Sequence, residues 1–80
     1  MGLDSKKQLI KEIKKRENVV IRFWKCDLGG YSFVEIRQYK RDKSGVFIPE
    51  KKFLTFVPDL LDEIINALIA VKQEFGMGKQ

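Results

Sequence analysis

Apolar and polar residues alternate through the middle of the chain. "VVIRFWKC", residues 19–26, is rich in β-branched and aromatic side chains, and "YSFVEIRQYKR", residues 31–41, follows period two. Both patterns are typical of strands. The shorter runs "VFIP" (46–49) and "KKFLTF" (51–56) predict a third and a fourth strand, with Pro49 suited to an edge. Because "DLGG" and "DKSG" supply turn residues, an antiparallel meander is expected.

The apolar spacing changes to three or four residues after Pro58. Proline suits the first position of a helix, and Asp59, Asp62 and Glu63 lie where the helix dipole favours anions. Gly76 and Gly78 follow the last periodic residues, so this helix is predicted to end near Phe75.

Residues 4–17, "DSKKQLIKEIKKRE", contain no glycine or proline. Asp4 or Ser5 can cap a helix, and Leu9, Ile10 and Ile13 form a narrow apolar stripe, so a short helix is predicted. Its lysines fit a basic arm, although a solvated helix face is the favoured interpretation.

The predicted fold class is α+β: a curved four-stranded antiparallel sheet followed by one C-terminal helix, with a short N-terminal helix. The C-terminal helix carries two apolar stripes side by side, more than one sheet face covers. We therefore expect a homodimer, although packing of the N-terminal segment is an alternative. The expected interface residues are Leu61, Ile65, Leu68 and Ile69.

Charge is distributed unevenly along the 80 residues. Residues 1–57 carry 14 basic and 7 acidic side chains, a net of +7, whereas residues 58–80 carry 2 and 4, a net of −2. A basic field favours polyanionic partners. The single cysteine, Cys26, and the absence of a signal-peptide pattern predict an intracellular protein, and the most apolar stretch is too short to cross a membrane.

The parity of the strands predicts two different sheet faces. If the C-terminal helix covers the face with Ile21, Phe23, Val34, Ile36, Leu54 and Phe56, the opposite face carries Arg22, Trp24, Phe33, Arg37, Tyr39 and Arg41. Cations that bind phosphates and rings that stack on unpaired bases are what single-stranded nucleic acid requires. The alternative is that these rings only pair across strands beneath arginine stems.

Catalysis and metal binding are not expected. The sequence contains no histidine, Cys26 has no base partner, and the hydroxyl residues form no nucleophile motif. The scattered carboxylates match no calcium loop. No catalytic residue, cofactor, metal or small-molecule substrate is therefore predicted.

The run from "VEIRQYKRDKSGVFIPEKKFLTF" into "VPDLLDEIINAL" resembles the positive cofactor four family of transcriptional coactivators. The family signature is an I-D-I-R-E-Y strand, a D-x-x-G turn, a proline followed by a basic pair, an I-S-L strand and an N-P-opened helix. Here these elements correspond to Val34–Tyr39, Asp42–Gly45, Pro49 with Lys51 and Lys52, Leu54–Phe56, and Pro58. The resemblance covers about residues 19–72.

The resemblance implies a dimer with a sheet backed by the helix, which binds single-stranded or melted DNA largely without sequence preference. The predicted domain organisation is a basic N-terminal segment at 1–17, as a short helix or arm, a single-stranded DNA-binding and dimerisation domain at 18–76, and a tail at 77–80. Lys40 stands where the human coactivator has a stacking tryptophan, and Val57 replaces the capping asparagine. The predicted nucleic-acid-binding residues are Arg22, Trp24, Lys25, Arg37, Tyr39, Lys40, Arg41, Lys51 and Lys52.

The predicted role is to hold or protect unpaired strands in transcription, replication or repair. The expected location is the cytoplasm, with the nucleoid, for a bacterial or viral protein and the nucleus for a eukaryotic one. RNA binding, and a protein module that recruits polymerase or other transcription or replication machinery, remain alternatives. No membrane partner is expected.

Overall fold

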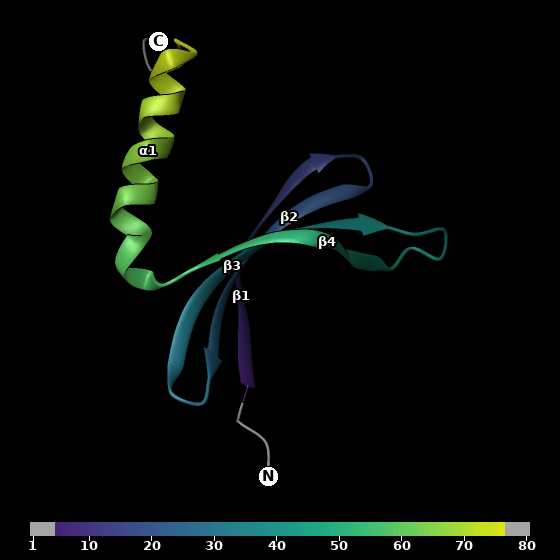
Figure 1. The fold of residues 1–80 in the computed structure, drawn as a ribbon. Coiled ribbons are helices and arrows are strands. Elements are labelled where there is room, and N and C mark those ends of the chain that lie inside the picture. The colour runs from purple at the N-terminus through teal and green to yellow at the C-terminus, as the bar shows by residue number, and fades with distance from the viewer. Residues whose placement is uncertain (1–4, 77–80) are drawn as a thin grey trace.

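A computed structural model describes residues 5–76 as one antiparallel sheet followed by a helix (Figure 1). The strands β1 (Ser5–Arg16), β2 (Val19–Leu28), β3 (Tyr31–Arg41) and β4 (Phe47–Phe56) are neighbours in sequence order. A 3-10 turn, η1 (Pro58–Leu60), leads into α1 (Leu61–Glu74). The predicted sheet and C-terminal helix are therefore confirmed.

The predicted N-terminal helix is wrong, because residues 5–16 form strand β1. β1 pairs with β2, and the register shifts between Leu9 and Lys11, so Ile10 is an extra residue in a bulge. The bulge interrupts period two and gives Leu9, Ile10 and Ile13 a helix-like spacing. When β1 pairs with β2, the backbone N–H and C=O groups on that edge of β2 gain hydrogen-bond partners. The free energy of these hydrogen bonds exceeds the small intrinsic preference of the segment for a helix. Asp4 and the predicted tail at 77–80 lie outside the described residues.

The predicted third and fourth strands are a single strand, β4. Pro49 lies inside β4, opposite Tyr39, and the register shifts before Phe53 pairs with Arg37. Proline is tolerated here because β4 is an edge of the sheet and needs no hydrogen bond on its outer side. The sheet thus has the predicted number of strands, but one of them comes from the N-terminal segment.

The register places two sets of side chains on opposite sides of the sheet, because directly paired residues share a face. Phe23 pairs with Ile36, which pairs with Leu54; Arg22 pairs with Arg37, which pairs with Phe53. We call the first side the apolar face; it carries Ile21, Phe23, Val34, Ile36, Leu54 and Phe56. We call the second side the aromatic–basic face; it carries Arg22, Trp24, Phe33, Arg37, Tyr39, Arg41, Phe47 and Phe53. This division agrees with the parity read from the sequence.

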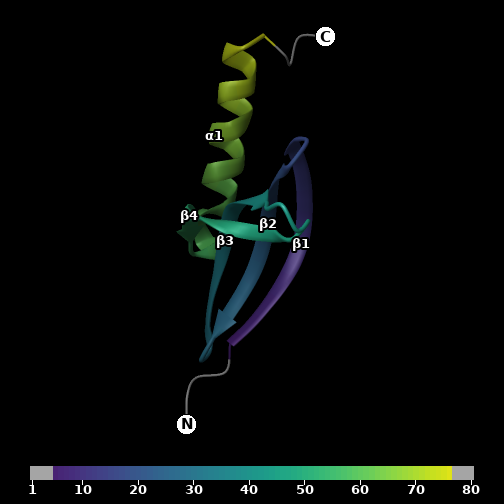
Figure 2. The same ribbon diagram turned by 90° about the vertical axis from the view of Figure 1, so that its right-hand side faces the viewer.

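Helix α1 stands clear of the sheet instead of backing it (Figures 1 and 2). None of its residues is buried. The radius of gyration is 15.4 Å, whereas a compact domain of this length has about 12 Å. Within the single chain the apolar face is therefore left open, and the expectation that the helix covers it is wrong for one protomer.

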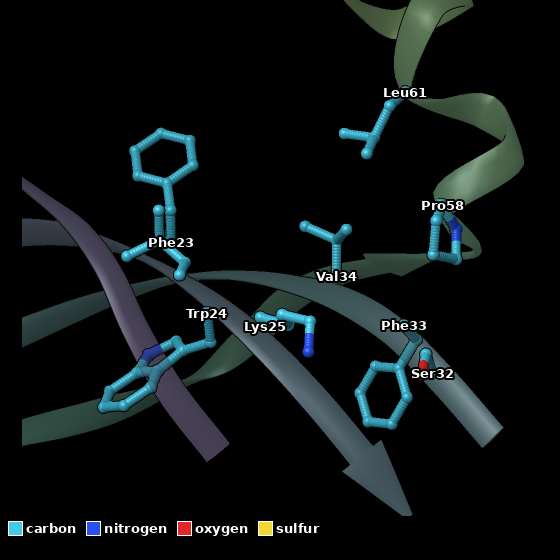
Figure 3. A pocket seen from close by; sticks show the side chains of 9 residues that line it. Phe23, Trp24, Lys25, Ser32, Phe33, Val34, Pro58 and Leu61 are labelled. Atoms are coloured by element: carbon cyan, nitrogen blue, oxygen red, sulfur yellow. The ribbon is translucent and has the colours of Figure 1, made fainter. Parts of the chain in front are cut away.

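An apolar cavity of about 340 Å³ lies between the apolar face and the base of α1. Figure 3 shows Phe23 and Val34 extending toward Leu61, while Trp24 and Phe33 extend from the other side of the strands. Ile10, from the bulge in β1, and Pro58 also line this cavity. The side chains that would form a core in a compact domain therefore surround an unfilled space here.

Candidate nucleic-acid interface

The centre of the aromatic–basic face is a row of four side chains, one from each strand. Glu12 of β1, Arg22 of β2, Arg37 of β3 and Phe53 of β4 are successive cross-strand partners. Two guanidinium groups directly opposite each other repel. The carboxylates of Glu12 and Glu35 offset this repulsion, since each lies beside one of the two arginines.

Arg22 is held in place by a carboxylate and two rings. Its Nε donates a hydrogen bond to Oε1 of Glu12 at 2.8 Å. Its guanidinium carbon lies 4.6 Å from the ring centroid of Tyr39 and 5.4 Å from that of Phe47. Tyr39 is only 6% exposed beneath it. The arginine thus covers the ring, and its charge is presented at the surface above the sheet.

Glu35 is the one buried charged residue among the described residues, at 7% exposure. Nζ of Lys7 lies 3.1 Å from its Oε2, and Nε of Arg37 lies 3.3 Å from the same atom. The Arg37 contact is within ion-pair distance but lacks hydrogen-bond alignment, so this Nε has no hydrogen-bond partner. One carboxylate therefore pairs with a cation from β1 and a cation from β3, which leaves a net positive charge, and a buried charge needs such pairing.

Aromatic rings lie under cations across the whole face. The guanidinium of Arg37 lies 3.8 Å from the Phe53 centroid, and that of Arg41 lies 4.8 Å from the Phe47 centroid. Nζ of Lys7 lies 4.7 Å from the Trp24 ring. These contacts agree with the alternative that arginine stems cover the rings, and they also place several positive charges over flat apolar surfaces.

Trp24 lies on the same face, with its ring beside that of Tyr39 on the neighbouring strand. Its ring centroid is 6.4 Å from that of Tyr39, with the planes tilted by 47°. Its Nε1 is buried and has no hydrogen-bond partner in the described part of the chain. Leaving a buried indole N–H unpaired costs about 1–3 kcal/mol.

Cys26 lies on the same face, paired with Lys7 of β1 and Phe33 of β3. It is buried, and burial together with the charge of Glu35 raises the pKa of its thiol. On the apolar face, Asp27 accepts hydrogen bonds from Ser32 and Lys25, which lower the pKa of its carboxyl.

The predicted binding residues fall into three groups. Arg22, Trp24, Arg37, Tyr39 and Arg41 come together on the aromatic–basic face. Lys25 and Lys40 pair with Val34 and Val19 and lie on the apolar face. Lys51 and Lys52 are exposed on edge strand β4, within the segment where the register shifts.

Sequence reasoning missed Lys7, Glu12, Phe47 and Phe53. Successive residues of a strand point to opposite faces. Because Leu54 was assigned to the apolar face, its neighbour Phe53 could have been assigned to the aromatic–basic face. Lys7 and Glu12 could not be found in this way, because their segment was read as a helix.

Residues 5–76 contain neither a membrane-spanning helix nor a metal-binding cluster. No helix within residues 5–76 has the length and apolar character needed to cross a membrane. The same residues contain no cluster of three or more cysteine or carboxylate side chains arranged to hold a metal ion.

Comparison with known proteins identifies the fold. No family model and no curated protein matches the chain. Two crystal structures of BPSL1147, a PC4 homolog from Burkholderia pseudomallei, each match 84% of this chain with a TM-score of 0.77. The orthorhombic form is 25% identical over 90% of its length, and the tetragonal form is 24% identical over 98%. The chain has the fold of a PC4 homolog, which confirms the resemblance found in the sequence.

Proposed function

We propose that this chain is a non-catalytic protein that binds single-stranded or melted DNA on the aromatic–basic face, as a homodimer and largely without sequence preference. One observation carries the proposal: three arginines, Arg22, Arg37 and Arg41, lie over aromatic rings on a sheet face that no other described element covers. The likeness to a PC4 homolog supports it.

The proposed mechanism is an exchange of partners. In the free protein, Glu12 pairs with Arg22, and Glu35 pairs with both Arg37 and Lys7. A DNA phosphate that displaces a carboxylate keeps the charge-assisted contact and releases counterions from the DNA. When Lys7 and Arg22 move toward phosphates, the rings of Trp24 and Tyr39 become accessible to bases. Contacts to phosphates and ring faces carry little sequence information.

The exposed lysines of β4 extend the same path. Lys51 and Lys52 lie at the edge of the sheet beyond Phe53, and we propose that they contact phosphates at the margin of the site. Lys25 and Lys40, on the apolar face, contribute only to the general positive field.

The open apolar surfaces support the dimer. Leu61, Ile65, Leu68 and Ile69 are all exposed on α1, and the cavity beside Leu61 is unfilled. Exposed apolar surface of this extent is typical of an interface. A second copy that contributes its own helix covers both surfaces at once and forms a closed two-fold assembly.

The test is a fluorescence-anisotropy titration of labelled single-stranded DNA, with the matching duplex and RNA, at two salt concentrations. Arg41→Ala and Lys40→Ala form a matched pair, since these neighbours are both exposed but lie on opposite faces. We expect Arg41→Ala to reduce the slope of log affinity against log salt by about 1 and Lys40→Ala to leave it unchanged. Equal slopes for both variants, or no preference for single strands over duplex, would overturn the proposal.

The RNA titration distinguishes the nearest alternative. If RNA of the same sequence binds more tightly than DNA under both salt conditions, the protein is an RNA-binding protein that uses the same face. If neither nucleic acid binds, the exposed faces serve a protein partner instead.

A further inference from the structure

A second pair of aromatic rings lies at the other end of the aromatic–basic face. Tyr31 and Phe33 follow the parity of Arg37 and Tyr39 on β3, so all four side chains share that face. The ring centroids of Tyr31 and Phe33 are 6.0 Å apart, and their planes are tilted by 35°. Tyr31 is 57% exposed. A large ring at the surface beside a second ring is a platform onto which another flat ring can stack.

A hollow of about 410 Å³ lies against this pair. It is lined by Tyr31, Phe33, Thr55, Phe56, Val57 and Leu60. The volume falls within the range of about 300–1,000 Å³ that is usual for small-ligand sites. The lining is mostly apolar, and the hydroxyls of Tyr31 and Thr55 provide donors and acceptors. This composition suits a nucleobase, which has two apolar faces and a polar edge.

The rings at the centre of the face are covered, whereas this pair is not. Tyr39 lies beneath Arg22, Trp24 beneath Lys7 and Phe53 beneath Arg37. Among residues 5–76, no lysine or arginine lies over the ring of Tyr31 or Phe33. A base can therefore reach Tyr31 without displacing a side chain, and stacking there avoids the cost of breaking an ion pair.

Arg37 connects this hollow to the row of cations. Phe33 and Arg37 are four residues apart on β3, a separation of about 13 Å along a strand. A short nucleic-acid strand that lies along β3 can thus place a base on Tyr31 and Phe33 while its neighbouring phosphates meet Arg37. Continuity with the cationic row favours a nucleic-acid occupant over a purely apolar protein segment.

We propose that the hollow beside Tyr31 and Phe33 is the first base-stacking site of this protein, occupied before the covered rings of Trp24 and Tyr39 open. The proposal rests on the proposed function and adds to it the location of a base.

The first measurement is the affinity of single-stranded DNA for wild type, Tyr31→Ala and Tyr31→Phe. Stacking of one base contributes about 1–3 kcal/mol, so Tyr31→Ala is expected to weaken binding about 5- to 150-fold. Tyr31→Phe keeps the ring and should bind within about twofold of wild type. The salt slope should be the same in all three proteins, because Tyr31 contacts no phosphate. Phe75→Ala removes an aromatic ring that is 76% exposed on the helix side and serves as the control.

The second measurement is photocrosslinking with an oligonucleotide that contains 5-iodouracil, followed by mass spectrometry of the linked peptide. We expect the crosslink on Tyr31 or Phe33. Wild-type affinity in Tyr31→Ala, or crosslinks confined to other residues, overturns this inference and leaves the proposed function intact. Loss of dimer in Tyr31→Ala at unchanged affinity per chain overturns it too, because the hollow then belongs to an interface between copies. If wild type binds no single strand, the proposed function itself fails.

Discussion

At the scale of single residues, the central feature is that Glu12 and Glu35 form ion pairs with basic side chains of the candidate interface. Glu12 binds Arg22 at 2.8 Å, and its side chain is partly exposed. Exposed ion pairs contribute little to stability, about 0–1 kcal/mol. Under the proposed function, the larger effect of Glu12 is to occupy the guanidinium that a phosphate would bind. Glu12 would then compete with nucleic acid from within the same chain.

This competition predicts that Glu12→Gln binds single-stranded DNA more tightly than wild type. Any loss of an acidic side chain favours a polyanion, so Glu17→Gln is the matched control: it makes the same charge change at a side chain that is 85% exposed and lies 3.6 Å from Nζ of Lys14, beyond hydrogen-bond distance. We expect Glu12→Gln to increase affinity severalfold more than Glu17→Gln and to steepen the salt slope by up to one phosphate contact. Anisotropy titrations check this, and equal effects of the two variants would contradict it.

At the same scale, the reactivity of Cys26 tests whether the folded sheet keeps this side chain buried. The thiol is buried, and burial raises its pKa above 9.0, so little reactive thiolate forms at neutral pH. We predict slow labelling by a disulfide reagent at pH 7.5 and fast labelling in urea. Because the folded pKa is raised, this group favours folding below the unfolded pKa, and that contribution is lost as pH rises through the folded pKa.

The control for the labelling experiment is a thiol at an exposed turn position, Lys43→Cys in a Cys26→Ala background. Its labelling rate should be nearly the same with and without urea. Rapid labelling of Cys26 in the native protein would show that the thiol is not kept buried in the folded sheet.

At the scale of elements, the turn between β3 and β4 depends on one carboxylate. Oδ1 of Asp42 accepts hydrogen bonds from the backbone N–H and the hydroxyl of Ser44 and from the N–H of Val46. The left-handed backbone of Gly45, with φ of 91°, closes the turn. The turn sets how β4 begins, and so it determines where Phe47 meets Arg41.

The same hydrogen bonds, that of Ser44 first, lower the pKa of Asp42 below 3.8. A lowered folded pKa means that this stabilisation is present above the unfolded pKa and is lost as pH falls through the folded value. We predict that Asp42→Ala lowers Tm at pH 7 and that its difference from wild type shrinks as the pH falls toward 2. Thermal melts by circular dichroism check this. Lys43→Ala, in the same turn, should show no such pH dependence.

The sequence allowed most elements to be predicted, and the exceptions have physical causes. Strands β2 and β3 and helix α1 were found because period two and the spacing after Pro58 are uninterrupted. β1 was missed because the bulge at Ile10 interrupts the alternation, and β4 was divided in two because Pro49 and the neighbouring lysines resemble a turn. Local sequence patterns do not reveal that the backbone of β2 lacks hydrogen-bond partners on one side until β1 pairs with it.

The candidate site was predictable to the extent that it depends on parity. Arg22, Trp24, Arg37, Tyr39 and Arg41 share one face because alternation alone places them there. Lys25 and Lys40 were assigned from the family resemblance, and parity places them on the other face. That Arg22 covers Tyr39 depends on Glu12, and thus on a strand that the sequence pattern concealed.

At the scale of the whole molecule, the single chain leaves both its apolar face and its helix uncovered. Leu68 is 63% exposed, and burying one such side chain contributes about 1.5–3 kcal/mol. Since α1 has no buried residue, the proposed dimer would supply this burial from a second copy. The positive aromatic–basic faces lie on the opposite side of each sheet and would remain open in such a dimer.

We therefore predict that the wild-type protein is a dimer by light scattering and that Leu68→Glu raises the dimer Kd at least 10-fold. The variant replaces apolar burial with a charge that must be desolvated, while glutamate retains a good helix propensity. Asn66→Glu introduces the same charge on the same helix outside both apolar stripes and should remain dimeric. A monomeric wild type, or a Leu68→Glu protein as dimeric as Asn66→Glu, would contradict the dimer. In that event the apolar cavity beside Leu61 must be covered by a different protein.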